Sequence, residues 1–167
     1  MQVTEFNLLP LDDAKTVLKH CVNIPSWVLH LAEHRPYESK HTLIQRAQQQ
    51  TTTWSWAEVK TSLDTHPRIG EKKAKQVLSA QEQALSEREQ AGIAQDAVSL
   101  NALQQGNLDY EAKFGFIFLI KAAGLSSEDI LEQLHQRLSN DIETEKVIVK
   151  QQLAQIAMLR LDQEIQA

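Results

Sequence analysis

The stretch KAKQVLSAQEQALSEREQ, residues 73–90, indicates the fold class of this chain. It contains neither Gly nor Pro and consists largely of Gln, Glu, Ala, Leu and Lys, which are strong helix formers. The same residue types prevail elsewhere, and only 5 Gly and 4 Pro occur among the 167 residues. This composition predicts an all-α protein.

Capping residues and the spacing of apolar residues predict a single bundle of about eight helices. We expect them at 12–21, 25–34, 39–50, 54–63, 73–90, 96–113, 127–138 and 142–165. The apolar run FGFIFLIKAAG, residues 114–124, has no periodicity that separates a buried helix from a strand. In so helical a chain we expect it to be helical as well.

Length and charge limit the function classes. A chain of 167 residues is expected to form one domain over 1–167, and 42% hydrophobic with 23% charged residues is typical of a globular protein. The formal net charge of −5 offers no basic surface for a phosphate backbone, so we expect no nucleic-acid partner. No apolar run approaches the ~20 residues that cross a bilayer, so no membrane association is expected.

The single cysteine, Cys21, cannot form an internal disulfide or a zinc site of several cysteines, which is typical of a reducing compartment. The first residues, MQVTEFNLLPLDD, lack the basic start and the apolar stretch of a secretory signal. We therefore expect a cytoplasmic protein.

The sequence HPRIG, residues 66–70, interrupts the expected helices. Pro67 disfavours helical geometry at the residue before it and Gly70 frees the backbone after it, so His66 is expected at a helix end or in a rigid loop. Imidazole is the side chain whose unperturbed pKa lies nearest neutral pH, which makes His66 a candidate general acid or base. The alternative is a histidine that only hydrogen-bonds locally.

A second candidate is the polar face of SEREQ, where Ser86, Glu89 and Gln90 stand at i, i+3 and i+4 of a helix. A carboxylate that accepts two N–H bonds beside an amide that donates and accepts can bind a flat, urea-like group. The alternative is a solvated helix. The same spacing recurs upstream in Ser79, Glu82 and Gln83. We favour the later set because Ala91-Gly92 lets the backbone turn directly after it.

Two further features need an explanation. Arg160 continues an apolar stripe of the last helix, so its guanidinium either reaches water or a structural carboxylate, or enters a pocket and binds a substrate carboxylate. Residues 114–124 are interpreted mainly as core, although Gly115 and the pair Ala122-Ala123 would let main-chain groups approach a planar ring.

The sequence HLAEH, residues 30–34, fits the H-x-x-E-H pattern of the inverted zinc peptidases. The helix is expected to end by Pro36, and no third ligand can be singled out, so we predict no metal site. His30 and His34 are interpreted as histidines near a helix C-terminus that interact with its exposed carbonyls.

Four stretches taken together resemble the family of 2-oxo-4-hydroxy-4-carboxy-5-ureidoimidazoline (OHCU) decarboxylases of urate breakdown. They are HPRIGE at 66–71, SEREQAGI at 86–93, GNLDYEAKFGFIFLI at 106–120 and LRL at 159–161. HPRIG together with REQAG in one helical chain of this size is specific, and the likeness covers almost the whole chain.

The resemblance implies an all-helical carboxy-lyase that needs no cofactor, converts OHCU into (S)-allantoin and commonly forms a homodimer. By position, His66 matches the family's catalytic histidine, and we assign Glu89 as its acidic partner. The segment 118–122 is implied to contact the substrate largely through its main chain. The implied substrate-binding residues are Pro67, Ser86, Glu87, Arg88, Glu89, Gln90, Phe118, Leu119, Ile120, Lys121, Ala122 and Arg160.

The chemistry of this substrate agrees with the implied residues. The electrons left by departing carbon dioxide can enter the neighbouring C=N bond and ring carbonyl, so no metal, pyridoxal or thiamine motif is required, and none is found. Our hypothesis is that His66 takes part in proton transfer while Glu89 sets its protonation state. Gln90 and Ser86 would fix the ring, and Arg160 would hold an anionic or carbonyl edge.

One departure from the family pattern keeps other functions open. Lys121 stands where a smaller, often thiol-bearing residue is expected. A decarboxylase of a related ureido or purine-derived acid is therefore an alternative. A helical binding module without chemistry is another, because an acidic, Gln-rich surface suits it equally well.

Overall fold

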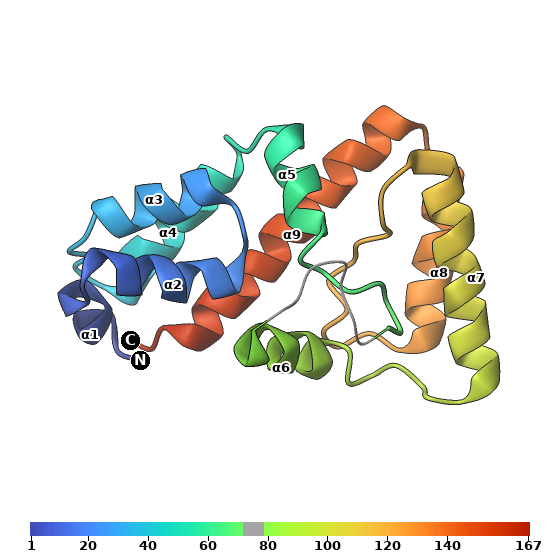
Figure 1. Cartoon of the computed structure of the whole chain (residues 1–167), viewed down its shortest axis with the longest axis horizontal. Helices are drawn as coiled ribbons and strands as arrows, with labels where there is room; N and C mark the ends of the chain where they lie inside the picture. The colour runs from blue at the N-terminus through green and yellow to red at the C-terminus, as the bar shows by residue number, and fades with distance from the viewer. Residues whose placement is uncertain (72–78) are drawn as a thin grey trace. The chain divides into compact units, whose positions relative to one another are not determined.

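The computed structural model describes residues 1–71 and 79–167, and these residues form nine α-helices (Figure 1). The prediction of an all-α fold is confirmed. The chain divides into two compact units, Met1–Ser62 with Leu153–Ala167 and Leu63–Gln152. One domain over 1–167 stays a prediction. In the part of the chain that the structure describes, no helix combines the length and the apolar character that a membrane span requires.

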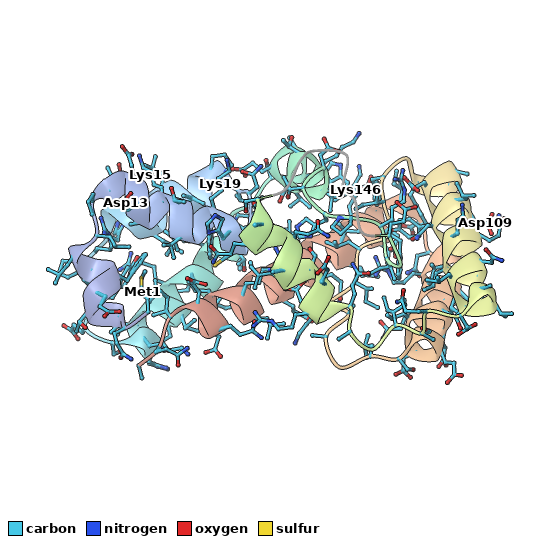
Figure 2. The ribbon with its side chains drawn as sticks, turned by 60° about the horizontal axis from the view of Figure 1, so that its bottom comes forward. Met1, Asp13, Lys15, Lys19, Asp109 and Lys146 are labelled. Carbon is cyan, nitrogen blue, oxygen red and sulfur yellow. The ribbon has the colours of Figure 1, made fainter. Side chains whose placement is uncertain are left out.

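The first unit contains α1 (Val3–Leu8), α2 (Leu11–Cys21), α3 (Pro25–Glu33), α4 (Lys40–Thr51) and most of α5 (Trp56–Leu63). The last residue of α5 belongs to the second unit. Helix α3 packs against both α2 and α4 (Figure 1). The buried Trp27 indole donates to the Ala47 carbonyl of α4 at 3.0 Å and meets the Trp54 ring edge-on at 6.4 Å between centroids. Charged residues of α2, among them Lys15 and Lys19, project outward (Figure 2).

Helix α1 was not expected from the sequence. The Gln2 N–H donates to the Glu5 carboxylate at 2.8 Å, which caps the helix, and Phe6 on its inner face is fully buried. A helix of six residues is too short to show a periodic pattern, so its stability comes from packing rather than from local propensity.

The second unit holds α6 (Ala80–Glu89), α7 (Ala97–Phe114), α8 (Ser127–Leu138) and the first part of α9 (Ile142–Glu164). Helices α7 and α8 lie side by side (Figure 1). Asp109 projects outward from α7 (Figure 2), whereas the next residue, Tyr110, is fully buried. Asp96 caps α7 and Ser126 caps α8, because their side chains accept the N–H groups of Ser99 and Asp129, respectively.

Helix α6 is shorter than the helix predicted over 73–90. Ser79 has an extended backbone, with φ −64° and ψ 160°, and its hydroxyl accepts from the Glu82 N–H, so the helix begins at Ala80. The earlier part of the prediction lies outside the described residues. A serine followed three residues later by glutamate is the sequence pattern of such a start.

The helix expected at residues 114–124 is wrong. Helix α7 ends at Phe114 because Gly115 adopts the left-handed conformation at φ +79°, and the chain continues outside helix or strand until α8. All five apolar residues at 116–120 are nevertheless buried. A run that is buried on every side carries no periodic signal, so its conformation depends on the surrounding helices.

The thiol of Cys21 is sealed in the first unit. Cys21 is 1% exposed at the end of α2. Burial and, to a smaller extent, the nearby carboxylate of Glu164 raise its pKa to about 12, while Arg160 partly opposes the increase. The thiol is therefore protonated at neutral pH.

We predict that Cys21 resists alkylation in the folded protein. Because the thiolate is the nucleophile, a pKa near 12 should slow the reaction with iodoacetamide at pH 8 by about 10²–10³-fold relative to the urea-unfolded chain. Mass spectrometry of timed aliquots measures both rates. Equal rates in buffer and in urea would contradict a buried, protonated thiol.

Candidate active site

His66 lies in the turn that follows α5. Its backbone N–H donates to the Leu63 carbonyl at 3.0 Å, and the next residue is Pro67. Both His66 and Pro67 are buried, with His66 7% exposed. The prediction that His66 lies at a helix end or in a rigid loop before Pro67 is confirmed, whereas its catalytic role stays a prediction.

The loop after His66 is attached to α7 by side chains. The Arg68 guanidinium donates through Nε and Nη2 to the two carboxylate oxygens of Glu111, each at 2.8 Å. Asn107 donates through Nδ2 to the Ile69 carbonyl at 2.9 Å. Hydrogen bonding to Glu111 raises the pKa of Arg68 above its usual value. These contacts fix the main chain directly after His66 and Pro67.

The end of α6 contacts the same loop through Gln90. The Gly70 N–H, at a residue with φ +85°, donates to Gln90 Oε1 at 3.0 Å. This contact sets the rotation of the side-chain amide, whose nitrogen is then the donor that Gln90 can offer to a ligand. The HPRIG and SEREQ stretches are therefore joined in space.

A cavity of about 360 Å³ is lined by α6, by residues between Pro67 and Glu71 and by residues that follow α6. This volume is in the range of small-molecule sites. Four of the predicted site residues line it: Pro67, Ser86, Glu87 and Gln90. The other described lining residues are Gly70, Glu71, Gln83, Ala91, Ile93 and Gln95.

One face of α6 forms the helical side of the cavity. Gln83, Ser86, Glu87 and Gln90 stand at i, i+3, i+4 and i+7 and so share that face. Glu89 is half-buried and is not among the described lining residues. Arg88 is exposed and is likewise not among them.

The competing set upstream is partly accounted for by the start of α6. Ser79 and Glu82 cap each other reciprocally, with the Ser79 N–H donating to the Glu82 carboxylate at 2.9 Å. Only Gln83 of that set lines the cavity. This arrangement favours the later set, although the choice of Glu89 as the acidic partner stays a prediction.

The predicted main-chain segment is buried. Phe118, Leu119, Ile120 and Ala122 are each at most 5% exposed, while Lys121 is half-exposed. These residues are not among those described as lining the cavity. Their contact with a substrate stays a prediction.

Arg160 is also buried, at 5% exposure on α9. It belongs to the first unit, where it lies close enough to Cys21 to lower the pKa of that thiol. A role for Arg160 toward a substrate stays a prediction.

The two histidines of HLAEH stack on each other at the end of α3. Their ring centroids are 4.0 Å apart, and the His34 Nδ1 lies 2.7 Å from the His30 carbonyl oxygen. The interpretation that a histidine here interacts with an exposed helix carbonyl is confirmed for His34. Over residues 1–71 and 79–167, no three His, Cys, Asp or Glu residues cluster in a way that could hold a metal ion.

Comparison with known protein families shows the family to which this chain belongs. The model of the family described as OHCU decarboxylase matches residues 7–162. The chain belongs to the OHCU decarboxylase family.

Three relatives of this chain carry names that refer either to uric acid degradation or to OHCU decarboxylation. The uric acid degradation bifunctional protein of Bacillus sp. (strain TB-90) is 27% identical over 98% of this chain and 32% of the relative. Its namesake TTL of Arabidopsis thaliana is 30% identical over 67% of this chain and 34% of the relative. The 2-oxo-4-hydroxy-4-carboxy-5-ureidoimidazoline decarboxylase of Amia calva is 37% identical over 48% of this chain and 46% of the relative. The chain thus spans about a third of the two bifunctional relatives.

Two solved structures share the family fold. An OHCU decarboxylase crystallised in the presence of (S)-allantoin superposes with a TM-score of 0.72 at 23% identity, covering 87% of this chain and 94% of the other. An (S)-allantoin synthase gives a TM-score of 0.71 at 17% identity, over 99% of this chain and 54% of the other. At these identities the likeness shows the fold alone.

Sequence reasoning missed the residues that hold the HPRIG loop of this OHCU decarboxylase family member. Asn107 and Glu111 contact the loop from α7, and Arg68 lies within the motif itself. The available signal was the i, i+4 spacing of Asn107 and Glu111, which puts two polar groups on one helix face. Only the fold identifies the loop as their partner.

Gly92 of the REQAG motif is needed for close packing rather than for an unusual φ. A Cβ atom built at Gly92 would lie 2.4 Å from the Leu125 carbonyl oxygen. The backbone after α6 therefore passes directly over the end of the segment that precedes α8.

We predict that Gly92→Ala lowers the free energy of unfolding by about 1–3 kcal/mol, because the new methyl group forces main chain apart. Urea denaturation followed by circular dichroism measures the change. Ala91→Ser, at the exposed neighbouring position, is the control and should leave the midpoint nearly unchanged. An equally stable Gly92→Ala protein would show that the close approach is absent.

Proposed function

We propose that this chain decarboxylates OHCU to (S)-allantoin in urate breakdown, as a carboxy-lyase that needs no cofactor. The observation that carries the proposal is the joining of HPRIG to SEREQ around one cavity, through the hydrogen bond from Gly70 to Gln90. Membership of the OHCU decarboxylase family supports the choice of substrate.

The proposed reaction balances without an added oxidant or reductant. The carbon–carbon bond to the carboxylate breaks, carbon dioxide leaves, and the electron pair forms a C=C bond to the ureido-bearing carbon, while the C=N electrons move to the ring nitrogen, which takes up a proton. A second proton then adds to the carbon that carries the ureido group, and the hydroxyl loses its proton as its carbon becomes a carbonyl. The protein has to orient the substrate, stabilise the developing charge and deliver the proton to one face.

In this proposal His66 transfers a proton at the hydroxyl and carboxylate side of the substrate. Its burial before Pro67 supports the role, because a fixed imidazole loses little freedom when the substrate binds. Glu89 sets the protonation state of His66 and accepts N–H groups of the ureido arm. Arg160 holds an anionic or carbonyl edge of the substrate.

The remaining positions bind the substrate. Gln90, oriented by Gly70, and Ser86, buried at 6% exposure, hold the ring. The segment 118–122 contributes main-chain groups. The other proposed contacts are Pro67, Glu87 and Arg88. A homodimer is the proposed working form, which the family resemblance supports. The cytoplasm is the proposed location, which the single cysteine supports.

The proposal is tested by supplying fresh OHCU and following allantoin by circular dichroism. Rapid appearance of one enantiomer is expected, because a proton that is delivered to one face of the ring produces a single enantiomer of allantoin. A rate and handedness equal to those of spontaneous decay would favour a binding module without chemistry.

We predict that His66→Asn lowers kcat by about 10²–10⁴-fold, the usual effect of losing a general acid or base. His135→Asn, at an exposed position of α8, is the matched control and should keep the wild-type rate. An unchanged rate of OHCU loss in the His66 variant would remove the imidazole from the mechanism.

A related ureido acid is the second candidate substrate. Lys121 favours it, because its half-exposed side chain brings a cation into the proposed substrate segment. Comparing kcat/KM for OHCU and for other ureido acids distinguishes the two candidates.

A further inference from the structure

The segment 116–122 poses a hydrogen-bonding problem. It lies outside helix and strand, yet all of its residues except Lys121 are buried. Backbone N–H and C=O groups that are taken from water need partners, and here no helix supplies them. Two side chains, from α8 and α9, provide such partners.

The first is Arg137 of α8, which is 6% exposed. Its Nη1 donates to the Leu119 carbonyl at 2.7 Å, and its Nε donates to Glu145 Oε1 at 2.7 Å. The guanidinium carbon also lies 4.5 Å from the centroid of the Phe118 ring. The Arg137 guanidinium that donates to the Leu119 carbonyl is thus itself held in place by its hydrogen bond to Glu145.

The anchor is the carboxylate of Glu145 on α9, which is fully buried. Tyr110 and Asn140 donate to it as well, the latter at 3.0 Å. Burial and the bond to Glu145 raise the pKa of Tyr110, which keeps its hydroxyl a donor. A buried carboxylate with several donors holds its partners in a defined geometry.

The second side chain is Gln152, also on α9. Its Oε1 accepts from the Lys121 N–H at 2.8 Å. Glu145, Val149 and Gln152 stand at i, i+4 and i+7, so both contacts come from one face of α9 within the second unit.

Leu119 and Lys121 flank Ile120 in the chain. The Leu119 carbonyl is held by α8 and the Lys121 N–H by α9. Neither of these two contacts uses a main-chain group of Ile120.

We propose that Arg137 and Gln152 are positioning residues, which hold Leu119 and Lys121 so that the main chain of Ile120 meets the ureido group of the substrate. An N–H and a C=O on one residue match a ureido arm, which both donates and accepts. The inference rests on the proposed function, because it takes OHCU as the ligand of segment 118–122.

The test compares three variants in α9. Gln152→Met keeps the side-chain length and removes the acceptor, whereas Gln152→Glu keeps an acceptor oxygen. Gln151→Met, at the exposed neighbouring position, is the matched control. Replacing Arg137 would leave Glu145 poorly paired in the core, so the Gln152 set decides the question.

Two readouts are taken for each variant. Amide hydrogen exchange over residues 117–122 directly reports the clamp, by which we mean the contacts of Arg137 and Gln152 with Leu119 and Lys121. This measurement needs no enzymatic activity. Steady-state kinetics with OHCU separate KM from kcat. Thermal unfolding reports whether the variant is globally destabilised.

We predict that Gln152→Met speeds exchange over 117–122 and raises KM about three- to tenfold, the usual effect of one lost neutral hydrogen bond, with kcat nearly unchanged. Gln152→Glu should restore both values toward wild type, and Gln151→Met should change neither.

Unchanged exchange, or faster exchange with an unchanged KM, would overturn the positioning role while the wild-type activity stands. A wild-type chain that does not accelerate OHCU loss would overturn the proposed function and this inference with it. The exchange data distinguish these failures, because they show whether the clamp exists irrespective of turnover.

Discussion

The second unit depends on the hydrogen bonds that the buried carboxylate of Glu145 accepts. A charge without solvent is tolerated only when donors surround it, and here Arg137, Tyr110 and Asn140 supply them. These donors come from α7, α8 and the turn before α9, so one carboxylate ties three helices together. Through Arg137 the same group also holds the Leu119 carbonyl, in a segment that has no helix of its own.

The candidate site is built outward from these helices. Arg68 and Ile69 are attached to α7 through Glu111 and Asn107, which fixes the loop next to His66. At the other end of that loop, the Gly70 N–H donates a hydrogen bond to Gln90 at the end of α6. This chain of contacts holds the main chain next to His66 against α7 and α6.

Local signals in the sequence predicted much of this architecture. Ser39, Asp96 and Ser126 begin helices because their side chains accept orphan N–H groups, and these interactions span only three residues. His66 stands in a turn because the following proline restricts it locally. The acidic partner was harder to choose, since Ser79 and Ser86 begin sets of equal spacing and only the fold shows that Ser79 caps α6.

By itself, the sequence determined the helical class, most helix boundaries and the two motifs that meet at the cavity, because each depends on residues within one or two turns. Tertiary structure alone decided the path of residues 115–126, the face of α6 that lines the cavity and the partners of the HPRIG loop. The physical reason is the same in each case: a buried polar group takes whichever partner the packed helices bring to it, and that partner lies far away along the chain.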